Sequence, residues 1–127
     1  MCGIAGILSP KKKIDLELLK RMTDAIAHRG PDGEGAWVDG DSKVGLGHRR
    51  LAIIDLTETG KQPMFYKNGR YVLTFNGEIY NYIELRQQLE ERGHKFVSTS
   101  DTEVLLALFH EKKERALDDL DGMFAFA

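Results

Sequence analysis

The single cysteine of the chain lies at position 2, directly after Met1. A thiol in a short apolar segment is usually a small buried hydrophobic group. Its position adds a second interpretation, because removal of Met1 would leave a thiol and a free α-amino group on one residue. An α-amino group has an ordinary pKa of about 8, so it can take the thiol proton near neutral pH. We therefore predict that Cys2 is an N-terminal nucleophile that needs no histidine.

Two Asn-Gly pairs occur in the chain, and their surroundings differ. Asn68-Gly69 separates two short apolar segments and predicts a tight hairpin turn. Asn76-Gly77 is followed at once by Glu78 and further polar residues, a denser polar group than a turn requires. An asparagine amide beside a glycine N–H offers two donors, the arrangement that stabilises the oxyanion of acyl transfer. We predict an oxyanion hole at this second pair, with a simple turn between strand and helix as the alternative.

Two adjacent arginines interrupt the apolar segment 46–54. In a strand, Arg49 and Arg50 point to opposite faces, so one can be solvated while the other points inward. An inward guanidinium requires a carboxylate, and its planar fork suits bidentate binding of one from the protein or from a ligand. Asp101 lies at the expected start of a helix, which is a common place for aspartate. Its functional interpretation is a counter-charge for a ligand amine.

Composition limits the function classes to which the chain can belong. Its 127 residues are 42% hydrophobic, with 18 basic and 20 acidic side chains. This is typical of one globular domain with its own core, and it offers no basic surface for nucleic acid. One cysteine cannot form an intrachain disulfide and fits a reducing compartment. With no apolar segment long enough to span a bilayer, we expect a cytoplasmic protein without nucleic-acid or membrane partners.

Two further kinds of site are not predicted. The histidines, at positions 28, 48, 94 and 110, show no short metal-ligand spacing with one another or with the cysteine. The chain also lacks a glycine-rich loop of the kind that cradles nucleotide phosphates. We therefore expect no metal in these residues.

Apolar periodicity and capping signals predict the elements that must position the candidate residues. Strands are expected over 2–8, 36–38, 44–54, 65–67, 70–75, 95–98 and 123–127. Helices are expected after Asp15, from about Asn81 to Gly93, after Ser100 and near Leu117. Both Asn81 with Glu84 and Ser100 with Glu103 have capping-box spacing.

Seven segments, in order along the whole chain, carry a resemblance to a known family. They are MCGIAGI at 1–7, HRGPDG at 28–33, GHRRLAIIDL at 47–56, QP at 62–63, FNGEIYN at 75–81, SDTEV at 100–104 and LDGMFAFA at 120–127. Each is weak by itself, but an ordered series with a cysteine near the N-terminus is very unlike chance. Together they resemble the N-terminal glutaminase domain of asparagine synthetases and their relatives, the class II (N-terminal nucleophile, Ntn) glutamine amidotransferases.

The resemblance implies an α+β fold, a four-layer αββα sandwich of the Ntn hydrolase type. It also implies hydrolysis of glutamine to glutamate and ammonia, with Cys2 as the nucleophile that forms a thioester. By the same resemblance, the Asn76 side chain and the Gly77 N–H form the oxyanion hole, and Arg50 binds the α-carboxylate of glutamine.

The remaining implied site residues recognise the other parts of glutamine. Glu78 and Asp101 are implied to bind the α-ammonium group. The backbone after Arg50 is implied to form one wall of the glutamine pocket, at Leu51, Ala52, Ile53 and Ile54. No cofactor is expected in this domain.

The expected partners are L-glutamine and an ATP-dependent synthetase domain, in cis or in trans, which uses the ammonia to make asparagine or a related amide. ATP and magnesium would belong to that synthetase domain. No Ser-Gly-Gly tripeptide of its ATP-binding loop occurs in the chain, so the synthetase domain is expected to be absent. Association into a homodimer is left open.

Residues 1–127 are expected to form one glutaminase domain, truncated and incomplete at its C-terminus, because the family continues past the MFAFA strand with further strands. The related phosphoribosyl-pyrophosphate and glucosamine-phosphate amidotransferases carry a Thr-Arg-Trp-Ala type of segment where this chain has GHRRLAIIDL, which favours the asparagine synthetase branch. The alternatives are a non-catalytic glutamine-binding or interaction module and an inactive truncated fragment.

Overall fold

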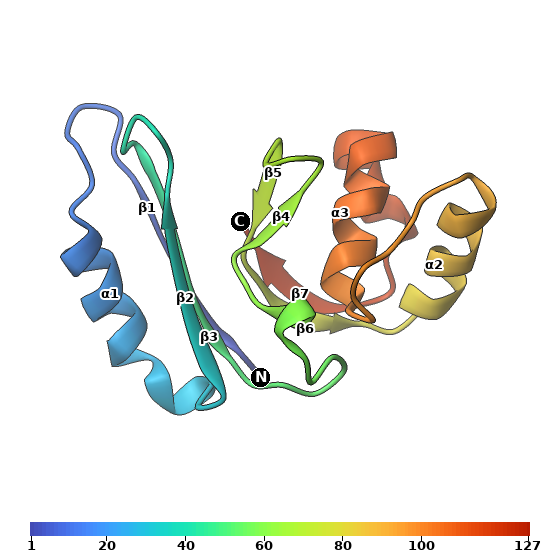
Figure 1. Cartoon of the computed structure of the whole chain (residues 1–127), viewed down its shortest axis with the longest axis horizontal. Helices are drawn as coiled ribbons and strands as arrows, with labels where there is room; N and C mark the ends of the chain where they lie inside the picture. The colour runs from blue at the N-terminus through green and yellow to red at the C-terminus, as the bar shows by residue number, and fades with distance from the viewer.

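The computed structural model describes all 127 residues, which form four layers (Figure 1). Helix α1 (Leu16–Ala25) covers the outer face of a first sheet, and helices α2 (Tyr82–Glu91) and α3 (Asp101–Lys112) cover the outer face of a second set of strands. The two strand layers face each other between the helices. This order confirms the αββα sandwich expected from the sequence.

The first helix and sheet use only residues 1–50. Strands β1 (Gly3–Leu8), β2 (Gly33–Val38) and β3 (Val44–Arg50) pair antiparallel in the order β1-β3-β2. Helix α1 begins where predicted, because the Asp15 side chain accepts a hydrogen bond from the Glu17 N–H. A short 3-10 helix, η1 (Ala27–Arg29), follows it.

The alternation of side chains along β3 sets what each face of the first sheet can do. Gly47 faces α1, where a methyl group on it would come within 2.5 Å of the Thr23 side chain. The helix therefore packs closely only because this position is glycine. His48 points the other way and bonds to the second strand layer. As predicted, Arg49 and Arg50 lie on opposite faces: Arg49 reaches α1, whereas Arg50 lies on the same face as His48 and lines a pocket.

The second strand layer comes from residues 62–79 and the end of the chain. Strands β4 (Met64–Tyr66) and β5 (Tyr71–Leu73) form the predicted hairpin, with positive φ angles of 54° at Asn68 and 80° at Gly69. Strand β6 (Phe75–Ile79) pairs antiparallel with β7 (Gly122–Phe126). The other edge of β7 is unpaired.

Helix α3 is the centre of the larger core. Its first eight residues are all buried, and the apolar ones, 104–108, share a core with Phe75 and Ile79 of β6 and with Leu85 and Leu89 of α2. As predicted, the Ser100 side chain caps the helix. A 3-10 helix, η3 (Lys113–Asp119), joins α3 to β7, and another, η2 (Glu58–Gly60), lies in the connection between the two halves. None of the helices combines the length and apolar character needed to cross a membrane.

Two predicted strands differ from the structure. The strand predicted over 44–54 ends at Arg50, because its guanidinium binds carbonyl oxygens of the following loop and the chain turns there. The segment 95–98 is not a strand, because the carboxylate of Glu103 accepts the N–H groups of Val97 and Ser98 in place of a neighbouring strand.

The turn considered as the alternative at Asn76-Gly77 and the cap predicted at Asn81 are both absent from the structure. Asn76 and Gly77 lie within β6 and not in a turn, because β7 supplies a complete antiparallel partner. Asn81 precedes α2 but its side chain does not cap the helix. Its amide instead binds the carbonyl of Asp119 and the N–H of Asp121.

Candidate active site

A pocket between the two strand layers brings together residues that are far apart in the sequence. Nine of the ten predicted site residues line it: Cys2, Arg50, Leu51, Ala52, Ile53, Ile54, Gly77, Glu78 and Asp101. The tenth, Asn76, is the neighbour of Gly77 on β6 but is not among the lining residues. Met1 also lines this pocket.

The thiol of Cys2 is held by the backbone of Leu51. The Leu51 N–H approaches Sγ to 3.3 Å, and the thiol lies 3.5 Å from the Leu51 carbonyl oxygen, which accepts from it. The side chain is partly exposed toward the pocket. With Met1 in place, the nitrogen of Cys2 belongs to a peptide bond and cannot act as a base.

Strand β6 has backbone donors on the edge opposite β7. Thr74 and Ala127 exchange both of their backbone hydrogen bonds, and in an antiparallel ladder such pairs recur at every second residue. Therefore the N–H groups of Phe75, Gly77 and Ile79 all point away from β7.

Side chains accept two of these three N–H groups. Gln62 Oε1 accepts from Phe75 at 2.6 Å, and Asp101 Oδ2 accepts from Ile79 at 3.1 Å. The N–H of Gly77, between them, has no such acceptor and belongs to a residue that lines the pocket. It is a free donor beside the thiol pocket.

The Asn76 side chain places an unpaired amide oxygen on the same strand. Its Oδ1 is buried and has no hydrogen-bond partner. Side chains alternate along a strand, so Asn76 lies on the face opposite Phe75 and Ile79, which pack against α3. That face is directed toward the first sheet. An unpaired buried acceptor is costly, and a hydrogen-bond donor bound beside it would remove that cost.

The two arginines of β3 have different electrostatic partners. Arg49 forms ion pairs with Asp24 and with Glu34, the latter at 2.8 Å. Arg50 has no carboxylate within 4.0 Å. Its guanidinium instead donates to the carbonyl oxygens of Asp55 and Thr57, the second at 2.8 Å. The positive charge of Arg50 is therefore left uncompensated at the pocket.

Two of the three carboxylates that line the pocket, those of Asp101 and Glu78, belong to predicted site residues. Asp101 is 5% exposed, and neither it nor Glu78 forms an ion pair. Burial raises the pKa of Asp101, hydrogen bonds from Ile79 and Thr102 lower it, and the nearby charge of Glu78 raises it again, so that the pKa stays above its usual value. A bound cation would stabilise this pair.

Residues that the sequence analysis did not select also lie at the site. Asp55 and Gln62 line the pocket. Burial alone would raise the pKa of Asp55, but hydrogen bonds from Thr57, Thr99 and Thr59 outweigh it and hold this pKa well below its usual range. The sequence Asp-Leu-Thr-Glu-Thr at 55–59 is typical of a loop in which an aspartate side chain accepts hydrogen bonds from the residues that follow it.

His48 is a third residue that the sequence analysis did not select; it does not line the pocket but bonds to β6, which does. Its ring is 1% exposed, and burial, with a contribution from Arg50, lowers its pKa to about 4. The ring is therefore neutral at pH 7. Its Nε2 lies 3.1 Å from the carbonyl oxygen of Phe75 and must donate to it, whereas Nδ1 is buried without a partner. The sequence feature that could have identified His48 is its position two residues before Arg50, which puts both side chains on the same face of the strand.

No group of three or more His, Cys, Asp or Glu side chains converges in a way that could hold a metal ion.

Comparison with known proteins identifies related chains. The family model described as a glutamine amidotransferase domain matches residues 1–127. Asparagine synthetase [glutamine-hydrolyzing] 1 of Bacillus subtilis is 49% identical over 99% of this chain and 20% of its own length. Asparagine synthetase B [glutamine-hydrolyzing] of Escherichia coli is 42% identical over 100% of this chain and 23% of its own length. The chain thus spans about a fifth of the length of these relatives.

A solved structure supports the fold independently. The glutamine phosphoribosylpyrophosphate amidotransferase of Bacillus subtilis superposes with a TM-score of 0.82 over 97% of this chain and 34% of that one, at 24% identity. At this identity the likeness concerns the fold alone, and it agrees with an Ntn-type αββα sandwich. With the family match over the full 127 residues, the chain belongs to the glutamine amidotransferase domain family.

Proposed function

We propose that residues 1–127 hydrolyse L-glutamine to glutamate and ammonia through a thioester on Cys2. The observation that carries this proposal is the content of one pocket: a reachable thiol, a free backbone donor at Gly77, and uncompensated charges of both signs at Arg50 and Asp101. A glutamine molecule provides a partner for each of them.

The first half of the reaction forms the thioester. Once Met1 is removed, the α-amino group of Cys2 takes the thiol proton, and the thiolate attacks the side-chain amide carbon of glutamine. The Gly77 N–H and the Asn76 amide stabilise the oxyanion. The protonated amine then gives its proton to the departing nitrogen, the C–N bond breaks, and ammonia leaves.

The second half regenerates the enzyme. Water adds to the thioester carbonyl while the same amine accepts its proton, and a second oxyanion forms at the same donors. The C–S bond then breaks to release glutamate, and the thiol regains its proton. One residue therefore acts as nucleophile and as base in both halves.

Recognition in this proposal depends on the α-substituents of glutamine. Arg50 binds the α-carboxylate, because its planar guanidinium suits bidentate contact and has no protein carboxylate nearby. Asp101 and Glu78 bind the α-ammonium group. The backbone of 51–54 forms the wall along the side chain of the substrate. A pocket of this kind selects a free amino acid over glutamine within a peptide.

The destination of the ammonia is proposed from the relatives. Those that this chain matches are asparagine synthetases, of which it covers about a fifth. We infer that a synthetase domain, in cis or in trans, receives the ammonia and makes asparagine or a related amide. ATP and magnesium would act in that domain and not in residues 1–127. A cytoplasmic location agrees with a free thiol nucleophile.

An ammonia-release assay combined with intact mass measurement tests the proposed function. The polypeptide that has lost Met1 should release ammonia from L-glutamine, and a Cys2→Ala variant should not. Glutamine binding without release of ammonia by the processed polypeptide would instead support a non-catalytic glutamine-binding module. The position of the thiol on the pocket surface favours catalysis over that alternative.

A further inference from the structure

Asp55 is a buried carboxylate to which the proposed mechanism gives no step. It is 6% exposed and lines the pocket. Its Oδ1 accepts the N–H and the hydroxyl of Thr57, at 2.8 and 2.7 Å. Its Oδ2 accepts the Thr59 hydroxyl at 2.9 Å and the Thr99 N–H at 3.0 Å. Four donors thus bind this carboxylate, and no cation lies within 4.0 Å of it, which indicates that its role is to organise the chain around it.

Three of these hydrogen bonds fold the loop that holds Arg50. The guanidinium donates to the carbonyl oxygens of Asp55 and Thr57, so the shape of this loop sets the direction of the guanidinium. The loop packs closely around Gly60. A methyl group on Gly60 would lie 2.5 Å from Arg50 and 3.0 Å from Asp55.

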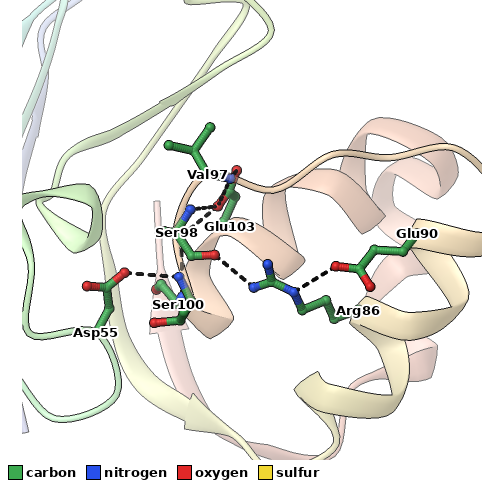
Figure 2. A network of polar contacts seen from close by, with 8 residues as sticks. Asp55, Arg86, Glu90, Val97, Ser98, Ser100 and Glu103 are labelled. Atoms are coloured by element: carbon green, nitrogen blue, oxygen red, sulfur yellow. Dashed lines mark hydrogen bonds and ion pairs between the residues drawn. The ribbon is translucent and has the colours of Figure 1, made fainter.

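The fourth hydrogen bond reaches the segment that leads to Asp101. Figure 2 shows the Asp55 carboxylate bonded to the chain between Ser98 and Ser100, at the start of α3. Glu103 holds the same segment from its other side, with the Ser98 N–H at 2.7 Å. Asp101 follows two residues after the N–H that Asp55 accepts, and it is the first residue of α3.

One carboxylate therefore contacts both halves of the recognition site. Through the loop 55–59, Asp55 positions Arg50, the proposed partner of the α-carboxylate. Through Thr99, it positions the start of α3 with Asp101, the proposed partner of the α-ammonium. Resting on the function proposed above, we propose that Asp55 is a positioning residue that fixes Arg50 relative to Asp101, and so matches the pocket to the two charged groups of a free α-amino acid.

Two electrophiles of different shape can test this role in the processed polypeptide. Iodoacetamide alkylates the Cys2 thiol without using the α-substituent sites, whereas the chloromethyl ketone analogue of glutamine requires both. In the Asp55→Asn variant, an amide NH2 replaces one acceptor oxygen, so at least one set of donors loses its partner.

We expect the glutamine analogue to label this variant at least about tenfold more slowly than wild type, which is the scale of one charge-assisted hydrogen bond. Labelling by iodoacetamide should stay within about twofold of wild type. In steady-state assays, KM for glutamine should rise by a similar factor with little change in kcat, because Arg50 and Asp101 bind the α-substituents equally well in the ground and transition states.

Asp39→Asn is the matched control. Asp39 also accepts two backbone N–H groups, those of Lys43 and Val44, but in the β2–β3 turn at the end of the first sheet away from the N-terminus. Both reagents should label Cys2 in the Asp39→Asn variant at the wild-type rates.

Three outcomes separate the possibilities. A wild-type ratio of the two labelling rates in Asp55→Asn would overturn the positioning role. Equal slowing with both reagents, accompanied by a lower melting temperature, would also overturn it, since that is the effect of a purely structural residue. If wild type itself shows no preference for the glutamine analogue over iodoacetamide, the proposed function fails, whatever the variant does.

Discussion

The sulfur of Cys2 lies 3.3 Å from the backbone nitrogen of Leu51, the residue that follows Arg50. The contact is a direct result of strand pairing, because Gly3 of β1 is paired with Arg49 of β3. The proposed nucleophile and the proposed carboxylate-binding arginine are therefore placed by one register. A shift of this register by one residue would move both away from the pocket.

Removal of Met1 should determine reactivity at Cys2. Only the processed chain has a free amine beside the thiol, so only this form should react rapidly with the chloromethyl ketone analogue of glutamine at neutral pH. Mass spectrometry of a mixture of processed and unprocessed chains checks this. Equal labelling of the two forms would show that the amine is not the base.

Replacement of Asn76 by alanine should lower kcat by about 10²- to 10³-fold, the usual cost of losing one oxyanion donor, with little change in KM. Asn68→Gly is the control, because Asn68 lies in the β4–β5 turn at a φ of 54°, which glycine adopts without strain. Ammonia release measures both variants. Similar losses in both would mean that the donor has been placed on the wrong strand.

Arg50→Lys should weaken glutamine binding by roughly 1 to 3 kcal/mol, because lysine keeps the charge but loses the planar fork. Arg49→Lys should leave KM unchanged. Its effect should fall on stability, since Arg49 pairs with the exposed carboxylates of Asp24 and Glu34, and such pairs contribute up to about 1 kcal/mol each. Glutamine KM and thermal unfolding separate the two effects, and a larger KM change at Arg49 would contradict this placement.

His48 should affect turnover through the position of β6. Its Nε2–H binds the Phe75 carbonyl, on the strand edge that also presents the Gly77 N–H. Glutamine can place an amide donor near the Nε2 position, so His48→Gln should retain most of kcat, whereas His48→Leu should lose about tenfold. The comparison of kcat in the two variants is the measurement. Equal activity of both would remove this role from His48.

The same histidine should make stability depend on pH. Its pKa in the folded chain, about 4, lies below the ordinary value of 6.5, so between these values the unfolded chain binds more protons. Its contribution to the free energy of unfolding is therefore complete above pH 6.5 and is lost as pH falls toward 4. Urea unfolding across this range should show a smaller decline in His48→Gln than in wild type.

Local signals in the sequence predicted the parts of the fold that depend on neighbouring residues. The cap at Asp15, the hairpin at Asn68-Gly69 and the opposite faces of Arg49 and Arg50 are confirmed because each is set by a few consecutive positions. The end of β3 and the absence of a strand at 95–98 were missed, because they depend on Arg50 and Glu103 binding distant or loop backbone.

Most of the candidate site was predicted, but the reason for its geometry was not. Periodicity placed Arg49 and Arg50 on opposite faces, residue types and positions suggested the roles of Cys2 and of the Asn76-Gly77 pair, and the resemblance assigned the inward role to Arg50. The hydrogen bond from Thr99 to Asp55 joins residues 44 positions apart, and His48 reaches a carbonyl 27 positions away. Such contacts leave no periodic pattern in the chain, so a single sequence does not reveal them.

The division of the chain into a half that ends at residue 50 and a half that begins at residue 62 has a consequence for how activity arises during folding. Each half contains complete strand pairings of its own, β1 with β3 in the first and β6 with β7 in the second, but the proposed nucleophile and the proposed oxyanion donor belong to different halves. Activity should thus appear only when the halves dock, later than secondary structure. Two separate polypeptides, 1–61 and 62–127, mixed after synthesis, should recover the pocket by complementation.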